Sequence, residues 1–450
     1  MQYVSTRGQA PALGFGDVLL TGLAPDGGLY VPDAWPALSP EVWAPGRPYA
    51  DVAVDVMFPF VDGSLTRDEL VAMVADAYAT FEHPAVCPVV PVGDLHLLEL
   101  FWGPTLAFKD VALQMVGRLF DHELTARSER ATIVVATSGD TGSAAIEACI
   151  GRDTLDIVVL HPAGRVSDVQ RRQMTTVDAP NVHNVAIEGT FDDCQDLVKA
   201  LFADVAFRER VRLSAMNSIN WARVMAQVVY YVSATAELGR SSFTVPSGNF
   251  GNIFAGWVAE KMGLPIDQLV IASNRNDILA RWVADGSMVA QDVVPTLSPS
   301  MDIQVSSNHE RLLFELSGRD GARTAELLQR FRGLGAVEAP RDDRFQAATI
   351  DDATTLAAIR RIYEEHGMLV DPHTAVGIAA AVAKRRSADV PMVVAATAHP
   401  AKFPDAVEQA TGIRPALPAR LADLLDREER YDVLANDVEA VRSYVLSVAG

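Results

Sequence analysis

The stretch TIVVATSGDTGSAAIEACI, from Thr132 to Ile150, decides the fold. Its first five residues are mostly apolar and β-branched, as in a strand buried inside a parallel sheet. The turn that follows, Thr137–Ser143, is rich in glycine and hydroxyl side chains, and a helix is expected over Ser143–Ile150. A strand, a short loop and a helix in this order form the repeating unit of open α/β sheets.

The same unit recurs along the chain after about residue 90. Further buried strands are expected at Asp156–Leu160, Phe243–Val245, Leu269–Ala272 and Met392–Ala396. Further helices are expected at Asp193–Leu201, Ala222–Leu238 and Asn252–Met262. The pattern predicts an α/β fold with two open domains, in which helices cover both faces of each sheet.

The two ends of the chain differ from this pattern. The first residues are rich in Pro and Gly and contain one expected helix, around Arg67–Phe81, whereas two helices are expected at the C-terminus, Leu417–Glu429 and Val433–Val448. We therefore divide the chain into three parts. They are an N-terminal accessory region (1–90), a smaller α/β domain (91–235) and a larger α/β domain (236–450) that ends in the two helices.

Composition narrows the function. The 450 residues carry a net charge of −20, which disfavours non-specific binding to nucleic acids and to anionic membranes. No apolar run approaches the ~18 residues of a membrane helix, and the first residues lack the pattern of a signal peptide. The odd number of cysteines (Cys87, Cys149 and Cys194) fits buried thiols in a cytoplasmic protein, and no cysteine or histidine spacing indicates a metal site.

Lysine is unusually rare in this chain. Only five lysines occur (Lys109, Lys199, Lys261, Lys384 and Lys402), and all other basic residues are arginines. Lys109 follows the largely apolar run Pro104–Phe108, and burial there would lower the pKa of its amine and leave it nucleophilic, as a Schiff-base lysine requires. The alternative is a solvated lysine at the start of a helix over Asp110–Leu124.

Two loops between a strand and a helix have the composition of anion sites. In Val245–Asn252, two glycines allow successive N–H groups to converge at a helix N-terminus, which suits a phosphate. Thr137–Thr141 combines hydroxyls with a helix start, which suits a carboxylate. A ligand-free turn and an ordinary N-cap are the respective alternatives.

Two further segments could complete such a site. Asn217, Asn220 and Arg223 would lie near one face if their segment is helical, and Arg223 could bind a phosphate with two hydrogen bonds. Thr397 follows the expected strand Met392–Ala396, at the sheet edge where open α/β proteins bind ligands. A lysine together with a separate phosphate site is what pyridoxal phosphate requires.

At this point the chain resembles the threonine synthase family, in its longer-chain branch, within the fold type II pyridoxal-phosphate enzymes. The resemblance runs nearly from end to end, in the family's order. It rests on the motifs STRG (5–8), LAPDGGLYVP (23–32), GPTLAFKD (103–110), ATSGDTGSAA (136–145), GRVS (164–167), QMTT (173–176), EGTFDDCQ (188–195), NSINWAR (217–223), PSGNFGN (246–252), NRND (274–277), LSPSMDIQVSSN (297–308), DPHTAVG (371–377) and ATAHPAKF (396–403).

The resemblance implies a role for each candidate residue. Lys109 would bind the cofactor covalently and then act as the catalytic acid and base at the substrate α-carbon, and Thr397 would face the pyridine nitrogen. The cofactor phosphate would be held by Ser247, Gly248, Asn249, Phe250, Gly251 and Asn252. The substrate would be held through its carboxylate by Thr137, Ser138, Gly139, Asp140 and Thr141, and through its phosphate by Asn217, Ser218 and Arg223. The role of Asp140 toward the cofactor stays open, since many relatives have Asn there.

The implied activity is that of a carbon–oxygen lyase acting on a phosphate ester. O-Phospho-L-homoserine and water would give L-threonine and phosphate, in threonine biosynthesis. One alternative is a related phospho-lyase that gives 2-oxobutyrate, ammonia and phosphate, and Trp102, which stands where the family usually has His, keeps it open. Another is an inactive protein that binds the cofactor or a phosphoamino acid. A nicotinamide enzyme is disfavoured because no dinucleotide fingerprint is present. A monomer and a homodimer both remain open.

Overall fold

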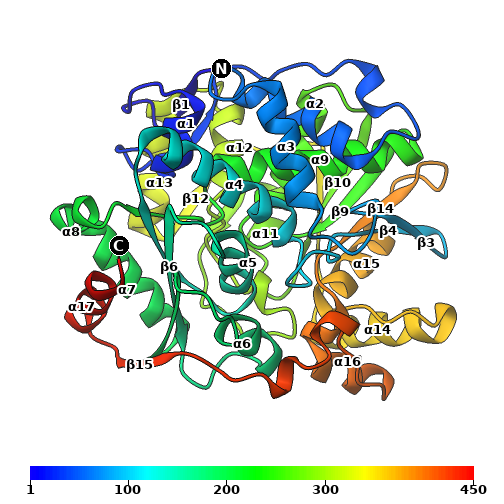
Figure 1. Cartoon of the computed structure of the whole chain (residues 1–450). Helices are drawn as coiled ribbons and strands as arrows, with labels where there is room; N and C mark the ends of the chain where they lie inside the picture. The colour runs from blue at the N-terminus through cyan, green and yellow to red at the C-terminus, as the bar shows by residue number, and fades with distance from the viewer. Residues whose placement is uncertain (450) are drawn as a thin grey trace.

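Two sheets organise the chain, and neither is built from one continuous segment (Figure 1). The computed structural model describes residues 1–449. The smaller sheet is parallel throughout. In order across the sheet, its strands are β15 (Asp432–Ala435), β7 (Val182–Glu188), β6 (Leu155–Pro162), β5 (Ala131–Ala136) and β8 (Leu213–Ser214). Every residue of the central strand β6 is buried, which explains its nearly continuous apolar sequence.

The larger sheet is parallel except for its edge strand β3, which runs antiparallel to β4. Its strands in order are β13 (Phe345–Thr349), β10 (Ile266–Ser273), β9 (Ser241–Pro246), β14 (Met392–Ala396), β4 (Leu95–Glu99) and β3 (Val89–Val92). The five strands expected from the sequence are thus all present, as β5, β6, β9, β10 and β14.

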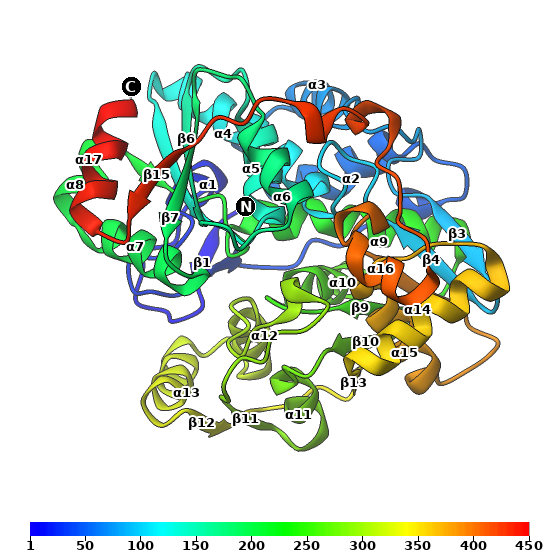
Figure 2. The same cartoon turned by 90° about the horizontal axis from the view of Figure 1, so that it is seen from below.

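Helices surround both sheets and fill the space between them (Figures 1 and 2). The helices that follow strands of the smaller sheet or lie beside it are α4 (Lys109–Arg127), α5 (Asp140–Cys149), α6 (Asp168–Thr175), α7 (Phe191–Ala203), α8 (Val205–Arg210), α9 (Trp221–Leu238) and α17 (Val438–Val448). Those that follow strands of the larger sheet are α10 (Gly251–Lys261), α11 (Ile278–Asp285), α12 (His309–Leu316), α13 (Gly321–Leu334), α14 (Asp352–His366), α15 (Pro372–Lys384) and α16 (Pro404–Thr411). Two short antiparallel strands, β11 (Ser287–Val289) after α11 and β12 (Ala336–Glu338) after α13, pair with each other.

The N-terminal region holds more helices than expected. Besides α3 (Arg67–Tyr78), which begins with a capping box between Thr66 and Glu69, it contains α1 (Phe15–Thr21) and α2 (Tyr49–Val61). The segment after the Pro-Asp-Gly-Gly turn is strand β2 (Tyr30–Pro32), which pairs with β1 (Tyr3–Ser5).

The expected C-terminal helices are wrong in part. Residues 417–429 form no α-helix but two 3₁₀ turns, Ala419–Leu421 and Leu424–Asp426, and β15 occupies the start of the second expected helix. The segment is held to α6 instead, because Arg171 pairs with Glu429 and the Arg430 N–H donates to Thr175 O. Figure 2 shows this segment (red) running from α16 past α6 to β15.

Two strands do not belong to the sheet expected from their position in the chain. Strand β4 lies within the stretch 91–235 but joins the larger sheet, and β15 lies within 236–450 but joins the smaller sheet. The division of the chain at residues 90 and 235 therefore stays a proposal, and in it β4 and β15 would each cross to the sheet of the other domain. Within residues 1–449 no helix is long and apolar enough to cross a membrane.

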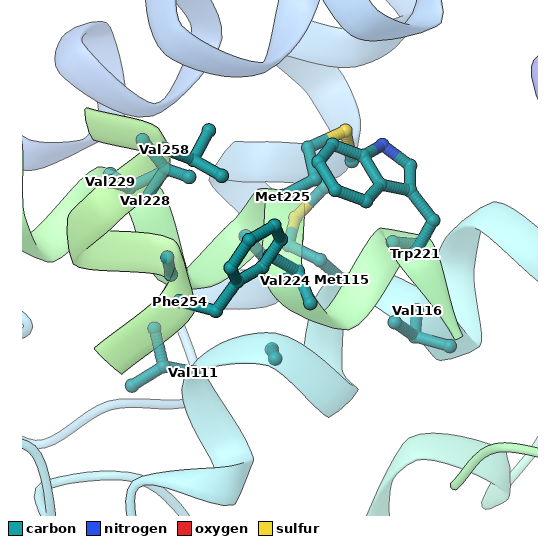
Figure 3. Close-up of a cluster of buried hydrophobic side chains, with 14 of the residues drawn as sticks. Val111, Met115, Val116, Trp221, Val224, Met225, Val228, Val229, Phe254 and Val258 are labelled. Carbon is teal, nitrogen blue, oxygen red and sulfur yellow. The ribbon is translucent and has the colours of Figure 1, made fainter. Parts of the chain in front are cut away.

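One apolar core joins the sheets through three helices. Figure 3 shows side chains of α4, α9 and α10 in contact at its centre, and each one is almost fully buried. They are Val111, Met115, Val116, Trp221, Val224, Met225, Val228, Val229, Phe254 and Val258. Because α4 and α10 each begin at a strand end of the larger sheet, this core fixes the loops that precede both helices.

We expect Trp221→Ala to lower the free energy of unfolding by about 3–5 kcal/mol, because it leaves a large cavity among Tyr3, Trp35 and Phe60. Urea denaturation followed by circular dichroism measures the loss. Val205→Ala is the matched control, since Val205 is 53% exposed and should change stability by less than about 0.5 kcal/mol. Equal denaturation midpoints for both variants would contradict this account of the core.

Candidate active site

Three neighbouring strands of the larger sheet end at the candidate site. Strands β9, β14 and β4 are adjacent and parallel, so their carboxyl ends lie at one edge. The loop after β4 returns to the end of β14, because the Phe108 N–H donates to Thr397 O at 2.9 Å. Lys109, the next residue, begins α4. The sheet therefore brings together the expected lysine, Thr397 and the glycine-rich loop after β9.

Lys109 is buried at the N-terminus of α4, and its side chain is only 10% exposed. Its Nζ lies 3.1 Å from Asp140 Oδ2 and 5.0 Å from the centre of the Phe108 ring. Burial lowers the pKa of Lys109, although the Asp140 carboxylate opposes the shift. The positive end of the helix dipole also disfavours an ammonium group there. The alternative of a solvated lysine is wrong for Lys109, and its amine is set up to lose a proton.

Asp140 is the charged group that compensates Lys109. It is the first residue of α5, where the helix N-terminus favours a carboxylate. Burial alone would raise the pKa of Asp140, but the ammonium groups of Lys109 and Lys402 and the Gln170 amide lower it well below its ordinary value. Asp140 is therefore ionised at neutral pH.

The loop after β9 presents a row of free donors. None of the backbone N–H groups from Gly248 to Ile253 has an acceptor among residues 1–449. Phe250 makes this possible by adopting φ of 65°, and its ring packs against His309 at 5.0 Å and Phe345 at 5.8 Å. A Cβ on Gly248 would meet Ser300 O at 2.5 Å, so the loop has no room for a side chain there. Converging N–H groups at a helix N-terminus form a site for a phosphate.

Side chains of the same loop differ in their availability. Ser247 Oγ already donates to Val245 O, and Asn249 Oδ1 accepts from Ser307. Asn252 Oδ1 accepts from Tyr230 and Tyr231, whereas its buried Nδ2 has no partner among the described residues. Backbone donors, with Asn252 Nδ2, therefore supply the anion-binding capacity of this loop.

The loop before α5 offers a second, smaller set of donors. Thr137 Oγ1 accepts from the N–H groups of Gly139 and Gly142 and so holds the loop in shape. Within residues 1–449, the N–H groups of Ser138, Asp140 and Thr141 have no acceptor. These three donors at a helix start can bind a carboxylate.

Arg223 is a buried cation without an acidic partner. It forms no ion pair within the described part of the chain, its Nε has no acceptor, and its one hydrogen bond goes to Met216 O at 3.4 Å. Burial lowers the pKa of Arg223 to about 10, and its charge is near enough to lower the pKa of Lys109 as well. A desolvated guanidinium of this kind is suited to bind an anion.

Residues 217–220 do not form a helix, so Asn217, Asn220 and Arg223 do not share one helix face as expected. Helix α9 begins at Trp221, and Asn220 is its N-cap, fully buried and hydrogen-bonded to Leu19 O. Asn220 is therefore structural. Ser218 lies beside the phosphate loop, because Asn308 Nδ2 donates to both Ser218 O and Asn249 O. Asn217 Oδ1 accepts from the Ile219 N–H, which leaves its amide group free.

These residues fit pyridoxal phosphate. The cofactor needs an amine that can lose its proton, a phosphate site and a partner for its ring nitrogen. Lys109 and the loop Gly248–Ile253 supply the first two. Thr397 is 6% exposed, and its hydroxyl has no partner among residues 1–449, so it is free to serve as the third. Within the same range, no group of three or more His, Cys, Asp or Glu could hold a metal ion.

Several residues of the site were not anticipated as such. Gln170, Gln173, Ser300, His373 and Lys402 all contact Asp140 or its neighbours. They lie in four segments far apart in the chain, and all except Gln170 belong to motifs on which the family resemblance rests, although no role was expected for them. Trp102 donates through Nε1 to Glu99, and its ring contacts His83 and Phe101.

Comparisons with known proteins agree with this geometry. Residues 95–397 match a family described as "Pyridoxal-phosphate dependent enzyme", residues 2–78 match "Threonine synthase N terminus", and residues 374–445 match "Threonine synthase, C-terminal". A curated threonine synthase from Pseudomonas aeruginosa is 54% identical over 99% of this chain and 98% of its own. A protein named "Threonine synthase-like 2" from Homo sapiens is 37% identical over 96% of this chain and 93% of its own.

A solved structure extends the agreement to the whole fold. The crystal structure of pyridoxal-phosphate-bound threonine synthase from Brucella melitensis superposes with a TM-score of 0.97, at 52% identity, covering 100% of this chain and 99% of that one. The fold type II architecture expected from the sequence is therefore confirmed. This chain belongs to the threonine synthase family of pyridoxal-phosphate-dependent enzymes.

Proposed function

We propose that this chain catalyses the conversion of O-phospho-L-homoserine and water to L-threonine and phosphate. The observation that carries the proposal is Arg223, a buried guanidinium without an acidic partner that lies near the cofactor lysine. The free N–H groups of Gly248–Ile253 would hold the cofactor phosphate, so Arg223 would be available for a second phosphate, that of the substrate. Full-length similarity to curated threonine synthases supports the same reaction.

Each end of the substrate would have a separate anchor. The α-carboxylate would accept hydrogen bonds from the N–H groups of Ser138, Asp140 and Thr141 at the start of α5. The γ-phosphate would lie against Arg223, with Asn217 and Ser218 beside it. Two anchors at opposite ends hold the α-carbon between them, close to Lys109, which favours reaction by proximity.

Lys109 would move the protons. When bound, pyridoxal phosphate withdraws electrons from the α-carbon of the substrate and so makes loss of its α-proton feasible. The Lys109 amine would take this proton and later return it, because its burial favours the neutral form. Arg223 would stabilise the charge that builds up on the departing phosphate. The buried surroundings of Lys109 would limit stray water until the phosphate has left.

Location and assembly belong to the same proposal. Cys87, Cys149 and Cys194 are all buried and unpaired, which supports a reducing, cytoplasmic setting. No nucleic-acid or membrane partner is proposed, and both a monomer and a homodimer are compatible with the site, since every residue named lies in one chain.

The decisive experiment is product analysis of the purified, cofactor-loaded protein with O-phospho-L-homoserine. We expect threonine and phosphate in equal amounts. Formation of 2-oxobutyrate and ammonia with phosphate would mean that the chain is a phospho-lyase, and no release of phosphate would mean a binding protein. Either result would overturn the proposed reaction.

Lys109→Ala should abolish turnover and remove the visible absorbance of the bound cofactor, because it removes the amine that would bind the cofactor covalently. Absorbance spectra and phosphate release measure both effects. Lys199→Ala, at a side chain that is 70% exposed, is the control and should retain both properties. A normal spectrum in Lys109→Ala would refute the assignment of the cofactor lysine.

Arg223→Ala should raise KM for the phosphorylated substrate by about 10-fold or more, since a charge-assisted hydrogen bond contributes about 1.5–3 kcal/mol. Cofactor loading, read from absorbance, should change little. Arg210→Ala, at an exposed position of α8, is the control. An unchanged KM in Arg223→Ala would exclude its contact with the substrate phosphate.

A further inference from the structure

A second lysine is buried beside the Lys109–Asp140 pair. Lys402, in the 3₁₀ turn Pro400–Lys402 after β14, is completely buried. Its Nζ lies 2.7 Å from Thr105 O, 2.8 Å from Gln173 Oε1 and 3.1 Å from Asp140 Oδ1. Two hydrogen bonds and the contact with the Asp140 carboxylate therefore hold the Lys402 side chain in one orientation.

Asp140 is divided between the two lysines. Oδ2 accepts from Lys109 at 3.1 Å and from Ser300 Oγ at 3.3 Å. Oδ1 faces Lys402 at 3.1 Å and accepts from Gln170 Nε2 at 2.9 Å. One carboxylate therefore serves two ammonium groups, and the buried carboxyl of Asp110 is a further acidic group within reach of the Lys402 charge.

A purely structural role does not require this charge. Gln173 Nε2 already donates to Thr105 O at 3.1 Å, so a neutral side chain at position 402 could complete the same hydrogen bonds. A buried charge is costly unless it is paired, and here the partner is shared with another lysine. The arrangement makes sense if the charge of Lys402 acts on Asp140 and, through it, on Lys109.

We propose that Lys402 is a positioning residue for Lys109, which shares the Asp140 carboxylate and so weakens its hold on the Lys109 proton. The proposal rests on the assignment of Lys109 as the cofactor lysine. With Lys402 present, Lys109 would lose its proton more readily, and its neutral amine would condense with the aldehyde of the cofactor, whose oxygen leaves as water. The Lys402–Asp140 pair also keeps Asp140 compensated when Lys109 is neutral.

The charged groups around Lys109 act on its pKa in opposite directions. Asp140 of α5 favours the charged amine, whereas Lys402 of the 3₁₀ turn and Arg223 of α9 disfavour it. His373 of α15 acts one step further away. It accepts from the Ser300 N–H at 3.2 Å, and its other nitrogen is bound to Asp371, so it holds the Ser300 loop beside Asp140. Without the Lys402 charge, Lys109 would be the one lysine paired with Asp140. The Asp140 carboxylate would then hold the proton of the Lys109 ammonium group more strongly.

The test is the pH dependence of cofactor capture by the full-length chain. Purified enzyme is stripped of cofactor and reloaded with pyridoxal phosphate, and the visible absorbance gives the rate from pH 6 to pH 10. For Lys402→Gln we expect the midpoint of the rate profile to rise by about one pH unit or more. Below that midpoint, capture should then be about 10-fold slower or more, because each unit lowers the neutral fraction tenfold. Lys199→Gln is the matched control and should leave the profile unchanged.

The outcomes distinguish failure of the proposal about Lys402 from failure of the assignment of Lys109. A slower rate at every pH with an unchanged midpoint would show a structural role only and would overturn the proposal, as would a midpoint that falls. If Lys402→Gln does not fold, Gln173→Glu decides, because it gives Lys402 a carboxylate of its own and should also raise the midpoint. An unchanged midpoint in folded Gln173→Glu would then refute the proposal. Failure of the lysine assignment itself would appear differently, as normal capture by Lys109→Ala.

Discussion

The burial of one ammonium group at the start of a helix is the constraint on which the candidate site depends. Helix α4 is buried from Lys109 through Phe120, so the Lys109 amine cannot reach solvent easily. Its position at a helix N-terminus makes the charged form still less favourable. Asp140, at the start of α5, supplies the compensating charge where a carboxylate is itself favoured. The charges at the two helix starts thus compensate each other, while burial keeps the pKa of the Lys109 amine below its ordinary value.

The helical core between the sheets holds this arrangement in place. Helices α4, α9 and α10 carry Lys109, Arg223 and the free N–H groups of the loop after β9, and their buried faces meet in one apolar cluster (Figure 3). The proposed sites for the cofactor and for the substrate phosphate therefore share one rigid support. The smaller sheet contributes Asp140 and the donors of the loop after β5, so the substrate would lie between elements of both sheets.

The local sequence predicted secondary structure correctly where that structure depends on residues close together in the chain. The strands expected at Thr132–Ala136 and Met392–Ala396 are present as β5 and β14, because their runs of apolar residues suit only a buried parallel strand. It was a poor guide at residues 417–429, where a helix was expected and two short 3₁₀ turns are found. There Glu429 and Arg430 bind α6, and these distant contacts hold the segment in an extended path.

By itself, the sequence determined the α/β fold class, the position of Lys109 before a helix, and the two glycine- and hydroxyl-rich loops that follow strands. Each of these depends on neighbours along the chain, which are visible in the order of residues. Only the tertiary structure decided that Asp140 lies between Lys109 and Lys402, that Arg223 has no acidic partner, and that Asn220 is a helix cap. Burial and charge pairing are properties of residues that meet from separate segments, and no local pattern records which segments meet.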